Sequence, residues 1–130
     1  MSDPSSPPGR SVVVADAPER QRYEGRVADA ADVAAAYYHR RGNAIVLTHT
    51  EVPPALEGRG IGGALARYAL DDARRRGLAV RPQCPFIASY IRRHPEYLDL
   101  VPEGAREQYG LPRAQARRAP EGASEASEPR

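Results

Sequence analysis

The sequence lacks lysine and tryptophan and contains a single cysteine, Cys84. All 19 basic residues are arginines, and 17 acidic residues nearly balance them, which leaves a formal net charge of +2. One cysteine excludes an internal disulfide and a structural zinc site built from cysteines alone. A nearly neutral chain also lacks the strong basic stripe of a dedicated nucleic-acid binder. We therefore expect neither a metal nor a nucleic-acid partner.

Long apolar runs are absent as well. A membrane-spanning helix needs about 20 consecutive apolar residues, and no segment of the chain provides them. Residues 1–10 are polar and proline-rich, without the apolar core of a signal peptide. We expect a cytoplasmic monomer with no membrane partner. We also expect disordered tails at 1–10 and over most of 104–130, where large apolar side chains are few, around a folded domain at 11–103.

Hydrophobic periodicity predicts the elements of this domain. Alternating or β-branched runs predict strands, and apolar stripes at helical spacing predict helices, although the alanines at 33–38 would also suit a helix. The strands are expected at 12–15, 23–27, 33–38, 44–52 and 78–81. The first helix is expected within 58–76, which begins as a glycine loop, and the second at 86–93.

Short turns between the early strands indicate antiparallel pairing, whereas the strand–helix–strand segment 44–81 indicates a parallel crossover. We predict a mixed α/β (α+β) fold: a mainly antiparallel sheet with one parallel crossover and two helices. Simple alternation along 44–52 would place Ile45, Leu47, His49 and Glu51 on one face of the sheet.

A glycine-rich loop, 58–63, joins the strongest strand to the first helix. Glycines allow positive φ and close approach of a ligand, and the free N–H groups at a helix start suit a phosphate. No Lys-Ser or Lys-Thr follows, so the loop is not a Walker motif, and no acidic residue is placed to hold the ribose of a dinucleotide. The alternative is a tight strand-to-helix turn without a ligand.

The loop resembles the pyrophosphate loop of the GNAT superfamily of acetyltransferases, [QR]-x-x-G-x-[GA]. Gly60 and Gly62 fill its two small positions, whereas Glu57 stands where glutamine or arginine is usual. Together with His-Thr-Glu-Val-Pro at 49–53, the segments 82–86 and 93–97 resemble the compact YjdJ-type branch of that superfamily. The resemblance runs from Val14 to Val101.

This resemblance implies an N-acetyltransferase fold, acetyl-CoA as co-substrate and an amine acceptor. It also implies that the loop amides bind the CoA pyrophosphate and that the preceding strand lines the pantetheine and the acetyl group. The chain has no room for the helical pair that follows the first strand in larger relatives and helps to form their acceptor site. The implied CoA-binding residues are Val52, Gly58, Arg59, Gly60, Ile61, Gly62, Gly63 and Ala64.

Three residues are candidates for catalysis. Imidazole titrates near neutrality, so His49 can act as a general base, with Glu51 orienting it or acting through water. Pro85 suits the first position of a helix and makes Cys84 its N-cap. Helix N-termini stabilise thiolates, so Cys84 can accept the acetyl group or return a proton to CoA. The alternatives are a hydrogen-bonded histidine at a strand end and a buried apolar cysteine.

Two other functions remain open from the sequence. A small fold without acceptor-site helices also suits a non-catalytic CoA or acyl-CoA sensor. The arginine clusters suit an RNA-binding module, which would bind in a salt-sensitive way.

Overall fold

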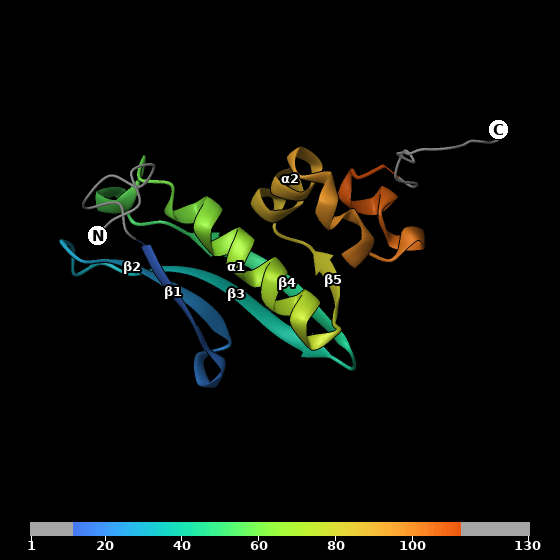
Figure 1. Ribbon diagram of the computed structural model, residues 1–130, viewed down its shortest axis with the longest axis horizontal. Helices are drawn as coiled ribbons and strands as arrows, with labels where there is room; N and C mark the ends of the chain where they lie inside the picture. Colours follow the sequence, from blue (N-terminus) through green and yellow to red (C-terminus); the bar gives the residue numbers. More distant parts are fainter. Residues whose placement is uncertain (1–11, 113–130) are drawn as a thin grey trace.

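The computed structural model describes residues 12–112. Five strands form one sheet, two α-helices follow the fourth and fifth strands, and short 3₁₀ turns complete the chain (Figure 1). The strands are β1 (Val12–Ala17), β2 (Arg22–Val27), β3 (Ala34–Arg41), β4 (Ala44–Glu51) and β5 (Ala79–Pro82), and the helices are α1 (Ile61–Arg76) and α2 (Pro85–Arg93).

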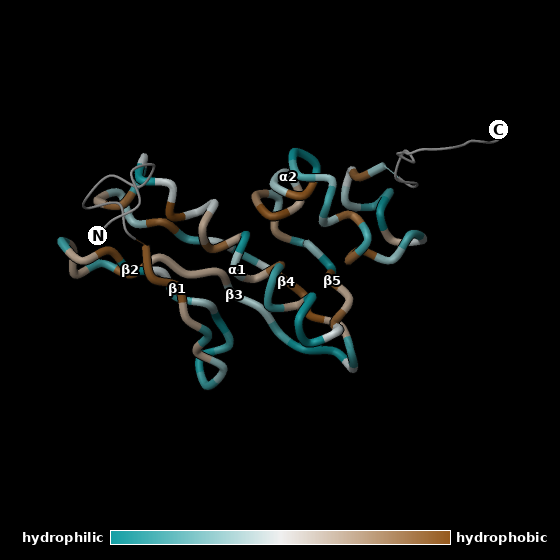
Figure 2. Tube along the Cα trace, in the orientation of Figure 1, coloured by the Kyte–Doolittle hydropathy of each residue, from teal (hydrophilic) through white to brown (hydrophobic). Residues whose placement is uncertain are grey.

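The sheet has the order β1-β2-β3-β4-β5. The first four strands pair antiparallel, and β5 pairs parallel to β4 after the chain has crossed over through α1. Both the predicted fold class and the predicted crossover are therefore confirmed. Only a 3₁₀ turn, Pro18–Arg20, joins β1 to β2, so no helical pair lies between them. Figure 2 shows that the turns after β1 and β3 are hydrophilic.

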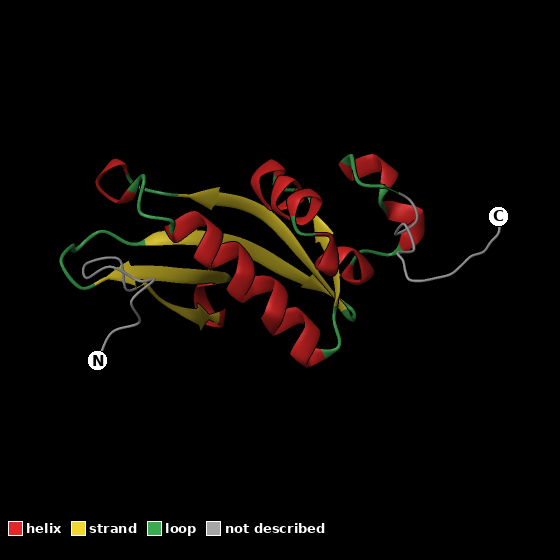
Figure 3. Cartoon of the chain, turned by 45° about the horizontal axis from the view of Figure 1, so that its top comes forward, coloured by secondary structure: helices red, strands yellow, loops and turns green. Residues whose placement is uncertain are grey.

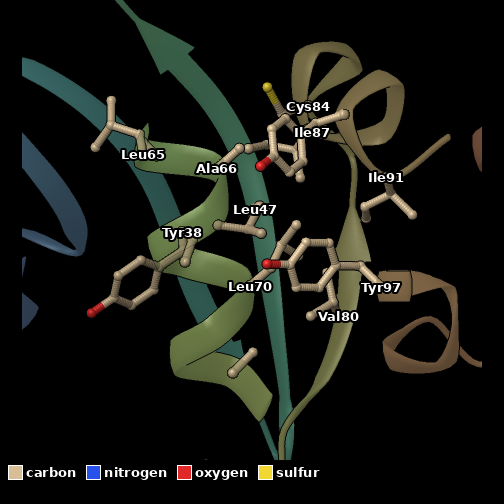
Figure 4. Close-up of a cluster of buried hydrophobic side chains, with 14 of the residues drawn as sticks. Tyr38, Leu47, Leu65, Ala66, Leu70, Val80, Cys84, Ile87, Ile91 and Tyr97 are labelled. Atoms are coloured by element: carbon tan, nitrogen blue, oxygen red, sulfur yellow. The ribbon is translucent and has the colours of Figure 1, made fainter. Parts of the chain in front are cut away.

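Helix α1 covers one face of the sheet, where most of the core lies (Figures 3 and 4). Small residues beneath it let it approach closely: a Cβ on Gly25 would lie 3.1 Å from the Ile61 side chain. Ala34 and Ala36 are fully buried on the same face. This demand for small side chains under a helix explains why β3 is alanine-rich. The 33–38 segment is therefore a strand, and it extends to Arg41.

A polar group is buried in the contact between α1 and the sheet. The Tyr23 hydroxyl donates to Asp72 Oδ2 at 2.8 Å, and Arg76 Nε lies 3.1 Å from the same oxygen. Arg75 also pairs with the Asp72 carboxylate, which is nearly inaccessible to solvent. Burial and the neighbouring carboxylate raise the pKa of Tyr23, so its hydroxyl stays protonated as a donor. The network fixes the position of α1 across β2.

A β-bulge interrupts β4. Tyr38 pairs with Leu47, but Tyr37, which precedes it in β3, pairs with His49. Thr48 is therefore an extra residue in β4. Opposed residues share a face, and neighbours along a strand do not. His49 therefore lies on the face opposite Leu47. The predicted common face for Ile45, Leu47, His49 and Glu51 is wrong because the bulge reverses the alternation.

The face opposite α1 is called the open face below. The second α-helix, α2, contacts only β4 and β5 appreciably among the strands. Within residues 12–112, no helix therefore covers β1–β3 on the open face. Val13, two-thirds exposed, is an example of a side chain on this face.

The packed chain continues beyond the predicted domain end at residue 103. Residues 103–105 and 107–109 form 3₁₀ turns, and Ala105 and Leu111 are buried. Arg106 Nε donates to the Val101 carbonyl, and Arg92 donates to the Gly110 carbonyl, which fixes this segment beside α2. Leu111 is the large apolar side chain that makes this packing favourable. The predicted tails at 1–10 and after 112 lie outside the described residues.

We expect Tyr23→Phe to lower the free energy of unfolding by about 2 kcal/mol, because it removes a buried hydrogen bond to a charged acceptor. Urea denaturation at pH 7 measures the effect. Tyr68→Phe is the matched control: Tyr68 packs edge-on against the Tyr23 ring, and no described residue hydrogen-bonds its hydroxyl. A control that loses as much stability as Tyr23→Phe would contradict the role given to the Asp72 hydrogen bond.

Candidate functional site

The sheet splits at the carboxyl ends of β4 and β5. Their parallel pairing runs from Ala44–Ala79 to Leu47–Pro82 and stops there. The Gln83 N–H donates a hydrogen bond to the Arg81 carbonyl at 3.0 Å, which makes a three-residue turn centred on Pro82. The Cys84 N–H donates to the Leu47 carbonyl at 2.9 Å. Beyond Leu47, β4 continues for four residues without a strand on its β5 side. This region is called the β4–β5 gap.

The glycine loop lies at the same end of β4. Gly58 and Gly60 have φ values of +81° and +76°, which favour glycine. Gly60 is the N-cap of α1, and no side chain caps the helix. The first intrahelical bond joins Ala64 N–H to the Gly60 carbonyl, so within residues 12–112 the amides of 61–63 have no acceptor. These amides and the helix dipole form an anion cradle without a neighbouring carboxylate in the first turn.

The remaining predicted loop residues have different environments. Arg59 pairs with Asp29 at 2.7 Å, which ties the loop to the β2–β3 connection and holds the pKa of Asp29 below its usual value. The Ile61 side chain is buried in the core, so only its backbone is available to a ligand. Ala64 and Val52 are half-buried beside the loop and at the end of β4.

Gly62 and Gly63 face α2. A Cβ on Gly62 would meet the Phe86 ring at 3.0 Å, and one on Gly63 would meet Tyr90 at 3.9 Å. The predicted loop residues thus form one surface at the start of α1, bounded by α2.

Cys84 lies at the gap, on the α1 side. It is the N-cap of α2 and Pro85 is the first helical residue, as predicted. The side chain is buried at one end of the core cluster (Figure 4). Its Sγ lies 3.2 Å from Thr50 Oγ. Thr50 pairs with Ala36, a core residue, and so projects to the α1 side of the sheet.

His49 and Glu51 lie on the open face of the same segment. His49 Nε2 is 3.2 Å from Glu51 Oε2, and both side chains are about 60% exposed (59% and 61%). The imidazole stacks on the Tyr37 ring, with 6.0 Å between centroids. The structure therefore brings His49 and Glu51 together and separates them from Cys84 by the thickness of β4.

A row of side chains holds Tyr37 in place. The Arg22 guanidinium lies 5.6 Å from the Tyr37 ring centroid and donates to its hydroxyl at 3.1 Å. Glu24, which is buried on the open face, pairs with Arg22 at 2.8 Å and with Arg26 at 3.1 Å. The hydrogen bond from Arg22 lowers the pKa of Glu24, so this carboxylate stays ionised. The row extends from β2 across β3 to His49.

Sequence reasoning missed Thr50 and Tyr37. Both touch predicted catalytic residues, but Thr50 projects toward Cys84 only because the bulge reverses the alternation. Tyr37 could have been found as an aromatic residue opposite His49 once the register was known. His94 does not join Cys84: it stacks on Tyr90, with ring centroids 4.1 Å apart.

Two kinds of feature are absent from residues 12–112. No group of three or more histidine, cysteine or carboxylate side chains is placed to hold a metal ion. None of the described helices has the length and apolar character that crossing a membrane requires.

Comparisons with known proteins agree with this geometry. A family described as GCN5-related N-acetyl-transferase matches residues 22–100, which include the loop, the gap and α2. Protein NATD1 of Xenopus tropicalis is 34% identical over 100 residues, covering 75% of this chain and 92% of that protein. Protein NATD1 of Homo sapiens is 37% identical over 85 residues, covering 63% of this chain and 75% of that protein. The chain belongs to the family of GCN5-related N-acetyltransferases.

Proposed function

We propose that this protein is an acetyl-CoA-dependent N-acetyltransferase of the compact YjdJ-type branch, acting as a cytoplasmic monomer on an amine. The observation that carries the proposal is the uncapped, glycine-rich start of α1 beside the end of β4, which has no strand on its β5 side. Cys84 lies on one side of that strand end and His49 on the other. Acetyl-CoA supplies a thioester, from which an acyl group can pass to a nucleophile.

The loop residues fit the coenzyme. The free amides of 61–63 suit a pyrophosphate, and the absence of a Cβ at Gly60 leaves the backbone accessible. Exposed backbone of β4 in the gap offers hydrogen bonds to the amides of a pantetheine chain, as a missing strand would. Arg59 then acts by holding the loop through Asp29 rather than as a free cation.

Acetyl transfer to an amine requires two proton movements. A free alkyl ammonium has a pKa near ~10.4, so a base must remove a proton before nitrogen attacks the carbonyl carbon. His49 is exposed on the open face, where an acceptor can reach it, and Glu51 orients its ring. As the N–C bond forms and the C–S bond breaks, Cys84 gives a proton to the departing sulfur. The resulting Cys84 thiolate takes the second proton that nitrogen loses on becoming an amide, and the proton held by His49 passes to solvent.

Cys84 also fits a second route, in which its sulfur takes the acetyl group first and the amine then removes it. Thr50 is a hydrogen-bond partner for the thiol in both routes. A sensor that binds CoA without turnover would use the same loop but would not need the groups in the gap. The grouping of His49, Glu51, Cys84 and Thr50 around one strand end favours the enzyme.

We expect Gly60→Asp to weaken CoA binding at least tenfold, because it places a carboxylate beside the phosphates. Like charges about 4 Å apart repel by about 4 kcal/mol at a protein surface. Isothermal titration calorimetry measures the affinity. Gly42→Asp is the matched control, since Gly42 also has positive φ and open space around its Cα but lies in the β3–β4 turn. Equal affinities for the two variants and the wild type would refute the cradle.

We expect Cys84→Ala to lower kcat about 100-fold, the usual contribution of a positioned proton donor, without changing CoA affinity more than threefold. Steady-state kinetics and calorimetry separate the two effects. Mass spectrometry of wild type mixed with acetyl-CoA alone distinguishes the routes: an acetyl group on Cys84 indicates the covalent one. An unchanged kcat would remove Cys84 from the reaction.

We expect His49→Gln to reduce kcat/KM about 100-fold, because the variant has no general base on the open face of the gap. Steady-state kinetics at pH 7 provide the measurement. His39→Gln is the control, because His39 lies on the same face of the neighbouring strand and pairs with Val46. A kcat/KM unchanged by His49→Gln would assign the base elsewhere.

A further inference from the structure

A polar groove of about 520 Å³ lies on the open face, away from the glycine loop. Val46 and Ala44 of β4 line it on one side, and the 3₁₀ turn at 107–109 lines it on the other. Its polar lining contains two guanidinium groups, three amides and a phenol, and no carboxylate: Arg41, Arg81, Asn43, Gln83, Gln108 and Tyr109.

The two arginines of this groove lack the partner that most other arginines have. Most arginines in residues 12–112 are paired with carboxylates or backbone carbonyls, as Arg74 is with Asp99 at 2.8 Å. Arg41 and Arg81 have no such partner among the described residues, although Arg81 is half-buried. A partly desolvated guanidinium without a counter-charge favours an oxyanion, which it can bind through two parallel hydrogen bonds.

The groove is placed to serve the acceptor rather than the coenzyme. It begins at the β3–β4 turn, whereas the glycine loop follows the other end of β4, which at eight residues is about 26 Å long. At its near end, the groove reaches Gln83, next to Cys84 and the β4–β5 gap. Arg81 and Gln83 both line the groove and are joined by the three-residue turn centred on Pro82. An oxyanion at Arg81 would thus lie close to the gap.

We propose that this groove binds an oxyanion of the acceptor, so that the enzyme prefers amines that carry a carboxylate or phosphate several bonds from the nitrogen. Arg41 and Arg81 bind the anion, and the amine extends past Gln83 to His49. The proposal rests on the acetyltransferase function proposed above. It explains how a chain without the usual acceptor-site helices can select a substrate.

Two acceptors of equal length test the proposal: 6-aminohexanoate, which has a carboxylate, and 6-aminohexanamide, which does not. We expect kcat/KM for the acid to exceed that for the amide at least tenfold through a lower KM. Arg81→Gln and Arg41→Gln should each raise the KM for the acid several-fold and leave the amide unchanged. 4-Aminobutyl phosphate, tested in the same way, shows whether phosphate or carboxylate is the better anion.

Arg93→Gln is the control, because Arg93 also has no partner among the described residues but lies at the end of α2, outside the groove. CoA calorimetry on every variant verifies folding and an intact coenzyme site. Equal kcat/KM for acid and amide, or equal losses in Arg93→Gln and Arg81→Gln, would overturn the inference while leaving the acetyltransferase function in place.

A titration without CoA tests the groove independently of the acetyltransferase function. In ¹H–¹⁵N NMR spectra, 6-aminohexanoate should shift the side-chain amides of Gln83 and Gln108, whereas 6-aminohexanamide should not. Such shifts would support the groove whether or not the bound amine is acetylated in the kinetic assay. Equal shifts with acid and amide, or no shift with either, would refute the groove.

Discussion

The site depends on where the parallel pairing of β4 and β5 stops. Pairing ends at Leu47–Pro82 because the chain turns sharply at Pro82, so that the Gln83 N–H bonds to Arg81 instead of continuing the ladder. Proline has a fixed φ that suits such a turn, and its missing N–H costs nothing on the outer edge of a sheet. The end of β4 is left with unpaired backbone, which in a folded protein requires water or a ligand. One turn thus creates the β4–β5 gap.

The bulge at Thr48 adds a second constraint on the same strand. Without it, His49 would project toward α1 into the core with Leu47, and Thr50 would project away from Cys84. With it, the strand end carries a thiol–hydroxyl contact on one face and an imidazole–carboxylate contact on the other. In the function proposed above, the coenzyme and the acceptor would approach this strand end from its opposite faces. Bulges are common beside active sites because they redirect side chains in this way.

The sequence predicted the elements well, since periodicity, glycine and proline report local structure directly. Pro85 and Gly77 marked helix ends that the structure has within one residue. It did not predict the faces of β4, because a bulge depends on the register with β3, which no local pattern encodes. Leu111 is buried through tertiary contacts of the same non-local kind.

The open face follows from the short connection between β1 and β2. The four-residue link at 18–21 leaves β1–β3 uncovered on one side within residues 12–112, and a sheet face that contacts water favours polar side chains. The Glu24–Arg22–Tyr37 row supplies polar side chains to this face and also holds the His49 ring in place. Arg41 and Arg81 lie outside that row and have no carboxylate of their own among the described residues. The paired charges on this face stabilise the fold, whereas Arg41 and Arg81 in the groove remain available to an anionic ligand.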